Sequence, residues 1–325
     1  MKKKGFSYAK WGYIFAAPFI IAFALFMLYP VIYTLIIGFT DMKGMAPGSV
    51  HILDDLFGNF KDVLSDPLFK KSLANTFIMW MLNFIPQIVL ALVLAAWFTN
   101  ERMKLKGKGF FKVVFYMPNI ITAATVAMLF YSLFSYPKGP INDILLSLGA
   151  IDTAYNFAVD ATAARLTVAF IQFWMWYGYT MIVLISGILG ISPDIFEAAD
   201  IDGANGFQKF IYVTLPNLKT IMLFTLVTSM IGGLQMFDIP KLYLDGGPND
   251  ATRTAQIYIY KKAFSGAYMY NSAAAASMIM FLIIAVFAGV IFFMLRDKDE
   301  AAMHKQIRQQ EKAYKAKLKA QKEGK

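Results

Sequence analysis

Residues 197–216, EAADIDGANGFQKFIYVTLP, form the longest polar, mixed-charge segment that lies between two strongly apolar runs. Just before it, Ser192-Pro193-Asp194 supplies an N-cap hydroxyl, a proline where no backbone N–H is needed, and an acid near the positive end of a helix. Gly203 can adopt the left-handed conformation that ends such a helix, and Asn205-Gly206 permits a second turn. Thr214-Leu215-Pro216 has the capping pattern of a further helix start. The segment therefore predicts a helix–turn–helix outside the membrane, with acids on its first helix and aromatic residues on its second.

The composition is that of a polytopic membrane protein. Hydrophobic residues make up 58% of the 325-residue chain and charged residues 16%, against about 45–50% and about 25% in soluble domains. The chain has no cysteine, which excludes disulfides and thiolate metal sites. Its two histidines, His51 and His304, lie far apart in the sequence, so we expect no metal site.

Six uncharged runs are long and apolar enough to predict six membrane-spanning helices, although the fifth is marginal in length. The first follows a basic head and is too long for a signal peptide, so we expect it to be retained as a helix. The runs are residues 11–40, 72–100, 113–137, 166–193, 220–237 and 263–295. We therefore expect an all-α membrane protein with a six-helix permease domain over residues 11–296, including a loop at 191–218.

The distribution of Lys and Arg predicts the orientation of this domain. Of the 31 basic residues, 21 fall in the N-terminal head, the 99–112 loop, the 191–220 segment and the C-terminal tail, and ten of these belong to the tail. The positive-inside rule then places both termini and the 191–218 loop in the cytoplasm. We expect residues 1–10 and 297–325 to be cytoplasmic tails. The charged C-terminal tail is typical of a solvated helix, or of one attracted to anionic lipid headgroups.

The uncharged spans also bear on the function. An ion-coupled secondary carrier or a membrane enzyme would usually need acidic or basic groups at membrane depth, and the six runs contain none. The chain has no G-x-x-x-x-G-K-[ST] motif, so we expect it to hold no nucleotide or other cofactor of its own.

At Glu197-Ala198-Ala199, Gly203 and Leu215-Pro216, the loop resembles the cytoplasmic coupling loop of permease subunits in ATP-binding-cassette (ABC) importers. The resemblance extends from about residue 11 to residue 296. It is closest to the carbohydrate-uptake class, in the partner with a GGP signature in its last outer loop, here Gly246-Gly247-Pro248. Two features depart from that class: Leu244-Asp245 replaces the usual residues before GGP, and the charged tail extends beyond the usual end.

This resemblance implies an ABC type I importer permease fold and a division of labour. A homologous second permease subunit would complete the path, two copies of an ABC ATPase subunit would bind ATP, and an external solute-binding protein would deliver substrate to the GGP loop. The residues implied in ATPase coupling are Glu197, Ala198, Ala199, Asp200, Gly203, Leu215 and Pro216. The chain itself would not be an enzyme, and it would lie in the bacterial plasma membrane.

Two helical faces are candidates for the substrate path, because sugars are bound by aromatic rings and neutral polar groups. Spacings of four and three place Gln172, Trp176 and Tyr179 on one face of the fourth span, with Met175 beside them. The fifth span repeats these spacings; its candidates are Ser229, Gly232, Gly233 and Met236, with Gln235 on a neighbouring face. The alternative is structural: the two glycines allow close helix packing, and the aromatic residues lie at the membrane interface.

We therefore expect a permease subunit of an importer for an oligosaccharide or a related sugar. Within the same class, the alternative is glycerol phosphate or a polyol. Outside it, the alternative is an ion-coupled secondary carrier.

Overall fold

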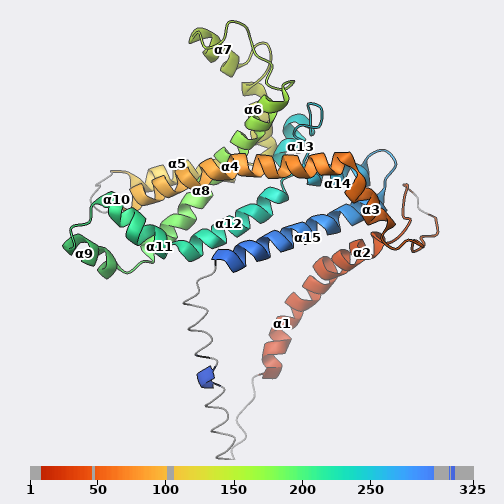
Figure 1. Ribbon diagram of the computed structural model, residues 1–325, viewed down its shortest axis with the longest axis horizontal. Helices are drawn as coiled ribbons and strands as arrows, with labels where there is room; N and C mark the ends of the chain where they lie inside the picture. The colour runs from red at the N-terminus through yellow and green to blue at the C-terminus, as the bar shows by residue number, and fades with distance from the viewer. Residues whose placement is uncertain (1–8, 46–47, 101–105, 296–306, 308, 312–325) are drawn as a thin grey trace, which may run out of the picture. The chain divides into compact units, whose positions relative to one another are not determined.

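The structure is a computed structural model that describes residues 9–45, 48–100, 106–295, 307 and 309–311 (Figure 1). Within these residues the regular elements are helices, apart from an isolated bridge between Thr40 and Ile52. The predicted tails, residues 1–10 and 297–325, lie outside the described residues except at residues 9, 10, 307 and 309–311. The chain forms two compact units: Met1–Ala74 with Arg253–Ile283, and Asn75–Thr252 with Ile284–Lys325.

Among the described residues, five helical segments are long and apolar enough to cross a membrane: Lys10–Ile37, Pro67–Thr99, Ala161–Leu189, Lys219–Leu244 and Tyr270–Met294. A sixth candidate is the pair Lys108–Ile120 and Ala123–Leu133, which is bent by 93°. The number of spans therefore agrees with the six predicted runs when this pair counts as one.

Two of the predicted spans are interrupted. Residues 113–137 do not form one straight helix, because Ile121 is extended and Thr122 caps a new helix by accepting a hydrogen bond from the Thr125 N–H. The last run is also interrupted. The helix Ala255–Phe264 ends before a turn at Gly266, where φ is +67°, and the final span begins at Tyr270.

Unit 1 joins the first span to short helices from distant parts of the sequence. The first span comprises α1 (Ala9–Phe23), the π-helical η1 (Ala24–Leu28) and α2 (Tyr29–Ile37). The amide of Asn59 in α3 (Gly58–Ser65) donates to the carbonyls of Gly38 and Thr40 at 2.9 Å and accepts from Asn271 at 2.9 Å. Asn271 lies in the first turn of α15 (Tyr270–Leu295). These buried hydrogen bonds fix the short helix against both segments.

A second brace in unit 1 joins α3 to α14 (Ala255–Phe264). Asp66 accepts a hydrogen bond from the Tyr258 hydroxyl at 2.7 Å and pairs with Lys262 at 3.3 Å. Burial alone would raise the pKa of Asp66, but hydrogen bonds from Tyr258, the Leu68 N–H and Lys262 outweigh it and lower the pKa. Burial, together with the hydrogen bond to Asp66, raises the pKa of Tyr258. The carboxylate therefore stays ionised at neutral pH and holds the two helices together.

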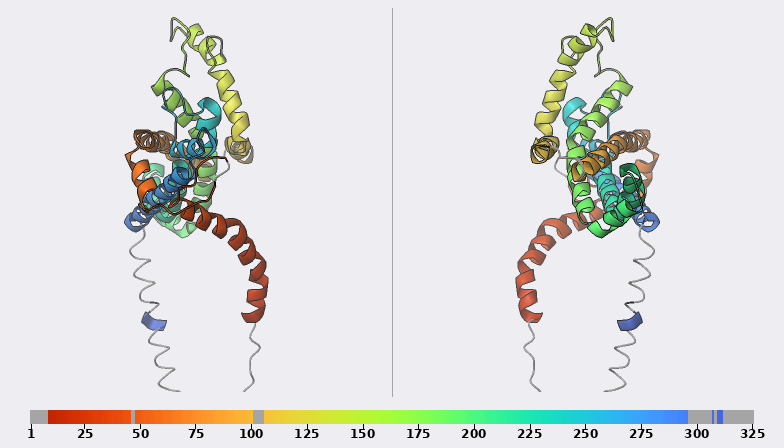
Figure 2. Two further views of the ribbon diagram at one scale, coloured as in Figure 1. Left: turned by 90° about the vertical axis from the view of Figure 1, so that its right-hand side faces the viewer. Right: turned by 90° about the vertical axis from the view of Figure 1, so that its left-hand side faces the viewer.

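Unit 2 is built around α8 (Ala161–Leu189). Its other elements are α4 (Pro67–Thr99, from residue 75), α5 (Lys108–Ile120), α6 (Ala123–Leu133), α7 (Pro140–Ser147), α9 (Pro193–Ile201), α10 (Gly206–Lys209), η2 (Phe210–Thr214), α11 (Leu215–Asn217), α12 (Lys219–Leu234) and α13 (Asp238–Leu244). α7 lies beyond the end of α6, away from the other helices of this unit (Figure 2).

Two apolar clusters hold these helices together. One joins α4, α6, α8 and α13 through buried residues that include Met79, Phe130 and Ile171. The other joins α4 and α8 to the start of α12 through Ala95, Met181 and Leu218. α5 lies close against α8, because a Cβ atom at Gly178 would be 2.0 Å from the carbonyl oxygen of Phe115. The space between the two clusters is bounded by α4, α8 and α12.

Candidate functional site

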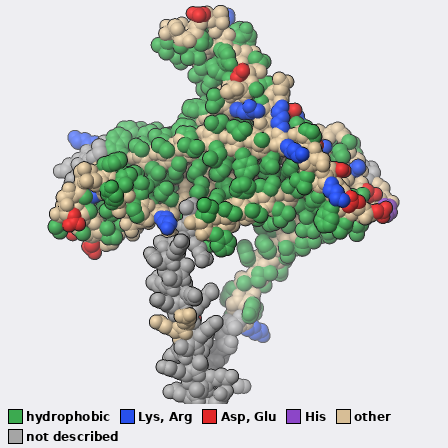
Figure 3. Space-filling model, viewed as in Figure 1, with side chains coloured by type: hydrophobic (Ala, Val, Ile, Leu, Met, Phe, Trp, Pro, Cys, Tyr) green, Lys and Arg blue, Asp and Glu red, His purple; other side chains and the backbone are tan. Residues whose placement is uncertain are grey.

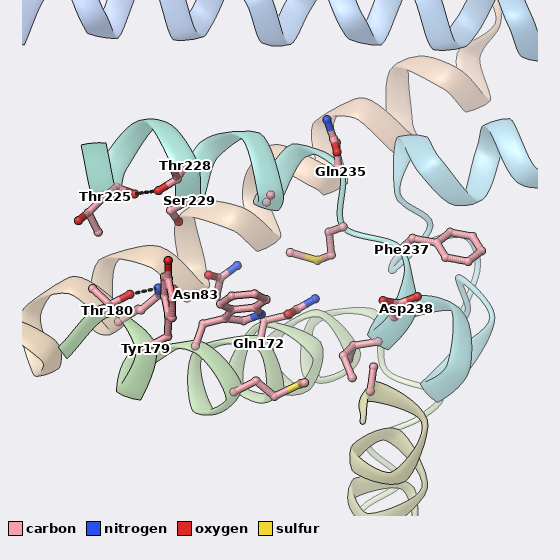
Figure 4. A pocket seen from close by; sticks show the side chains of 18 residues that line it. Asn83, Gln172, Tyr179, Thr180, Thr225, Thr228, Ser229, Gln235, Phe237 and Asp238 are labelled. Carbon is pink, nitrogen blue, oxygen red and sulfur yellow. Dashed lines mark hydrogen bonds between the residues drawn. The ribbon is translucent and has the colours of Figure 1, made fainter. Parts of the chain in front are cut away.

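A cavity of about 350 Å³ lies in unit 2, between α4, α8 and α12 (Figure 4). All eight residues that the sequence predicts for the substrate path line it: Gln172, Met175, Trp176, Tyr179, Ser229, Gly232, Gly233 and Met236. The other lining residues are Asn83, Gln87, Ala123, Thr180, Thr225, Thr228, Gln235, Phe237, Asp238 and Ile239. The two faces chosen from helical spacing therefore lie around one space.

The α8 wall combines aromatic rings with an amide. The side chain of Asp160 caps the start of α8 by accepting from the Ala163 N–H at 2.6 Å, which fixes the helix from its first turn. Trp176 and Tyr179 are exposed, and their ring centroids lie 5.9 Å apart at an interplanar angle of 86°. Met175 is only 7% exposed and also belongs to the apolar cluster that joins α4, α6, α8 and α13. The wall thus offers two ring faces beside the Gln172 amide, which suits the C–H surfaces and hydroxyls of a sugar.

The two glycines of α12 have different roles. A Cβ atom at Gly233 would lie 2.1 Å from Cδ1 of Trp80, so this glycine lets α12 pack closely against α4, as the structural alternative proposed. A Cβ atom at Gly232 would meet nothing within 4 Å. The Trp80 indole N–H also lies 3.4 Å from the Ser229 hydroxyl. Gly233 therefore sets the distance between two walls, and Gly232 leaves open space beside it.

Helical spacing does not extend to Met236, beyond the end of α12. The helix ends at Leu234, and Met236 follows the cap residue Gln235, so Met236 lines the cavity without sharing a helical face with Ser229 and Gly233. Gln235, expected on a neighbouring face, also lines the cavity, since its backbone leaves the helix.

α4 also contributes to the cavity, which was not predicted from the sequence. Asn83 and Gln87 lie four residues apart on this helix, are buried, and line the cavity. Gln87 donates to the Thr180 hydroxyl of α8 at 2.7 Å, which links two cavity walls (Figure 4). Two amides spaced one helical turn apart in an apolar run are a recognisable signal, because a buried amide requires partners.

The helix–turn–helix at 191–218, called here the Glu197 loop, has the predicted outline. α9 ends before Gly203, whose φ is +77°, and Asn205 then caps α10 in a capping box with Gln208 at 2.8 and 2.9 Å. Lys209 of the second helix pairs with Asp200 of the first at 2.8 Å. Figure 3 shows acidic side chains gathered over α9.

Two capping predictions in this loop are wrong. The Ser192 hydroxyl does not cap α9, but instead lies 3.3 Å from a carboxylate oxygen of Asp194. Thr214 does not start a new helix: it is buried within continuous helical backbone that runs from α10 through η2 to α11. The capping box at Asn205 already satisfies the first N–H groups of that segment, so no second start is needed.

The residues proposed for ATPase coupling lie at the surface of unit 2. Glu197, Ala198, Asp200, Gly203 and Pro216 are exposed, whereas Ala199 and Leu215 are half-buried. In contrast, Gly246 of the GGP signature is buried, and Gly247 and Pro248 are half-buried.

Residues 246–252, called here the GGP loop, are fixed by two side chains from other helices. Arg165 of α8 donates to the Ala251 carbonyl at 2.9 Å and to the Asn75 side-chain oxygen at 3.0 Å. Asn75 in turn donates to the Asp250 carbonyl at 2.7 Å. The Thr252 hydroxyl closes the loop on the Gly247 carbonyl at 2.6 Å. Much of the GGP signature therefore stabilises the conformation of the loop and does not form an open contact surface.

Long apolar helices around a cavity lined by polar and aromatic side chains are typical of a membrane transport protein. The chain belongs to the family of binding-protein-dependent transport system inner membrane components, whose model matches residues 68–298. It is therefore a permease subunit of an ABC importer.

Relatives of this chain include named sugar permeases. It is 32% identical over 88% of its length, and 94% of the relative's, to the lactose transport system permease protein LacF of Rhizobium radiobacter. It is 29% identical to the arabinooligosaccharides transport system permease protein AraP of Bacillus subtilis (strain 168), over 84% of this chain and 85% of that protein. The crystal structure of a bacterial ABC transporter involved in the import of the acidic polysaccharide alginate has the same fold. It matches with a TM-score of 0.74 at 23% identity, covering 87% of this chain and 94% of that one.

Proposed function

We propose that this permease subunit carries an oligosaccharide or a related sugar, and that the cavity between α4, α8 and α12 forms its half of the translocation path. The observation that carries the proposal is the lining itself. Two exposed aromatic side chains, Trp176 and Tyr179, face a space shared with the amides of Asn83, Gln87 and Gln172. Neutral amides and hydroxyls hydrogen-bond sugar hydroxyls without the strong binding that would prevent release.

The same lining disfavours the other substrates considered. No Lys or Arg is found among the described residues around the cavity, so a glycerol phosphate would bring its charge into a space without a partner. A polyol has no ring face to lie against Trp176. An ion-coupled carrier would need titratable groups along the spans, and the cavity has a single carboxylate among its described residues, at Asp238.

We further propose that the Glu197 loop, residues 191–218, lies in the cytoplasm and transmits movement from an ATPase subunit. Its short helix α9 ends just before the turn at Gly203. An ion pair between Asp200 and Lys209 connects α9 to the second helix of the loop. The exposed Glu197 supplies a charge for a basic residue of the partner, and the exposed Ala198 keeps this part of the helix slim. α12 follows this loop directly, so a displacement of the loop would move one wall of the cavity.

The proposed assembly has a second, homologous permease subunit, two ABC ATPase subunits that bind ATP, and an external solute-binding protein. In this arrangement both termini are cytoplasmic, and residues 1–10 and 297–325 are tails of the six-helix domain at 11–296. The GGP loop would face outward and contact the binding protein through Gly247 and Pro248, since Gly246 is buried.

Import measurements on paired variants test the proposed path. In the complete complex with its binding protein, Tyr179→Ala and Gln172→Ala should each reduce sugar import about tenfold or more while basal ATP hydrolysis remains. Phe170→Ala is the matched control, because Phe170 is an exposed aromatic residue of α8 that does not line the cavity. Import at the normal rate with unchanged sugar affinity in both path variants would contradict the proposal.

A further inference from the structure

The charges around the cavity narrow the class of substrate. Resting on the proposed function, we infer that this subunit selects neutral sugars and rejects acidic ones, and that Asp238 is the residue that makes this distinction. A solved structure with the same fold belongs to an importer of an acidic polysaccharide, so the fold alone does not fix a preference of charge. Such a preference has to come from the cavity side chains.

Asp238 is the one carboxylate among the described lining residues, and none of them is a Lys or Arg. It is exposed at the start of α13, where the chain has left α12. Its carboxylate makes no hydrogen bond or ion pair with any residue that the structure describes. Figure 4 shows its carboxylate at the end of the cavity that also holds Gln172. A negative charge is thus available there to whatever enters.

A free carboxylate acts differently on the two kinds of sugar. A neutral sugar donates hydroxyl hydrogens to it, and hydrogen bonds to a charged acceptor are stronger than those between neutral groups. A uronic acid brings a second negative charge, which the low-dielectric walls of Trp176 and Met175 do little to screen. Without a lining cation, that charge also loses its hydration without gaining a partner. The cavity therefore favours neutral sugars on both grounds.

Asp238 also has a structural explanation, because an acid in the first turn of a helix is stabilised by the helix dipole. Asp143 is the matched case: it lies in the first turn of α7, and it does not line the cavity. If Asp238 served only the helix, Asp238→Asn and Asp143→Asn would have comparable consequences. A role in selection predicts that only Asp238→Asn changes the ratio of acidic to neutral sugar bound.

The test is saturation-transfer NMR on the purified complex without its binding protein, with maltotriose and trigalacturonic acid as probes. The wild-type complex should bind maltotriose in preference to trigalacturonic acid. In Asp238→Asn this ratio should shift about tenfold toward the acid, and in Asp143→Asn it should not change. High salt should narrow the wild-type preference, since it screens charge at an exposed carboxylate. Circular dichroism then checks that both variants keep their helices.

The outcomes separate this inference from the proposed function. If maltotriose binds and Gln172→Ala removes that binding, but Asp238→Asn leaves the ratio unchanged, the selection by charge is wrong and the sugar path stands. Equal binding of both probes by the wild type would also overturn the inference. If neither probe binds, or if Gln172→Ala leaves their binding unchanged, the proposed path itself fails.

Discussion

The Glu197 loop and the GGP loop both carry recognisable motifs, yet the structure holds them in opposite ways. The Glu197 loop exposes most of its motif residues, and the ion pair between Asp200 and Lys209 lies within the loop. The GGP loop is closed on itself and anchored from two other helices by Arg165 and Asn75. A motif in a loop can therefore specify either a surface for a partner or a local fold.

We therefore expect substitutions in the two loops to affect different properties, namely the stability of the subunit and its coupling to the ATPase. Substitutions at the anchors of the GGP loop should lower the stability of the subunit. Substitutions in the Glu197 loop should leave it nearly unchanged and act on the ATPase instead.

Arg165→Ala should have the largest effect on stability. It removes two charge-assisted hydrogen bonds, to the Ala251 carbonyl and to the Asn75 side chain, and leaves both acceptors to find other partners. We expect the free energy of unfolding to fall by about 2–4 kcal/mol. Thermal unfolding of the purified subunit or complex in detergent measures it. Arg165→Lys is the matched control, because it keeps the charge but cannot reach both acceptors with a planar fork, and its stability should fall between those of the wild type and Arg165→Ala.

Gly203→Val should have a smaller effect on stability and a larger one on coupling. Gly203 has a φ of +77°, and a Cβ atom there would meet nothing within 4 Å, so the cost is that of the backbone alone. That cost is about 1–2 kcal/mol for a non-glycine residue, and it would alter the angle between the two helices. Sugar-stimulated ATP hydrolysis should fall, with only a small change in unfolding temperature.

Gly206→Val is the control for this variant. A Cβ atom at Gly206 would also meet nothing within 4 Å, but this glycine begins α10 and its φ is not positive. The variant should retain stimulation of ATP hydrolysis by sugar. Equal losses in both variants would show that bulk in the loop, rather than the turn at Gly203, is what matters.

Glu197→Lys should change stability by less than about 0.5 kcal/mol, because the side chain is exposed. It should nevertheless abolish sugar-stimulated ATP hydrolysis or release the ATPase subunit, since the charge offered to the partner is reversed. Co-purification of the ATPase and measurement of its activity distinguish these results. Asp202→Lys, a charge reversal at an exposed position of the same loop, is expected to retain coupling. Normal import by Glu197→Lys would contradict the coupling role.

Single-cysteine substitutions, which should have the smallest effect, test on which side of the membrane each loop lies. The chain has no cysteine, so single cysteines can be read without background. A cysteine at Asp245, beside the GGP loop, should react with an impermeant reagent from outside. A cysteine at the exposed Phe207 should react only after permeabilisation, and Phe207 avoids disturbing the Asn205 cap. Labelling in the opposite pattern would reverse the orientation and remove the basis for coupling.

The membrane class, the approximate spans, the turn at Gly203 and the α8 face of Gln172, Trp176 and Tyr179 could all be predicted from the amino-acid sequence. These properties depend on composition or on spacing within one helix, so a single segment contains the necessary information. Capping patterns were less reliable: Asn205 caps the second helix of the Glu197 loop, but Thr214 does not start a further helix, because the helical backbone that begins at Asn205 continues through it.

Which helix faces meet could not be predicted from the sequence and is known from the packing of the folded chain. It brought Asn83 and Gln87 of α4 to the cavity and assigned Gly233 to packing against Trp80. It also anchored the GGP loop on Arg165, 86 residues from Ala251 in the sequence. The physical reason is that these contacts arise between helices that are far apart in the chain. The side chains at a helix surface are set locally, whereas the partner of that surface is set by how the whole bundle buries its apolar faces.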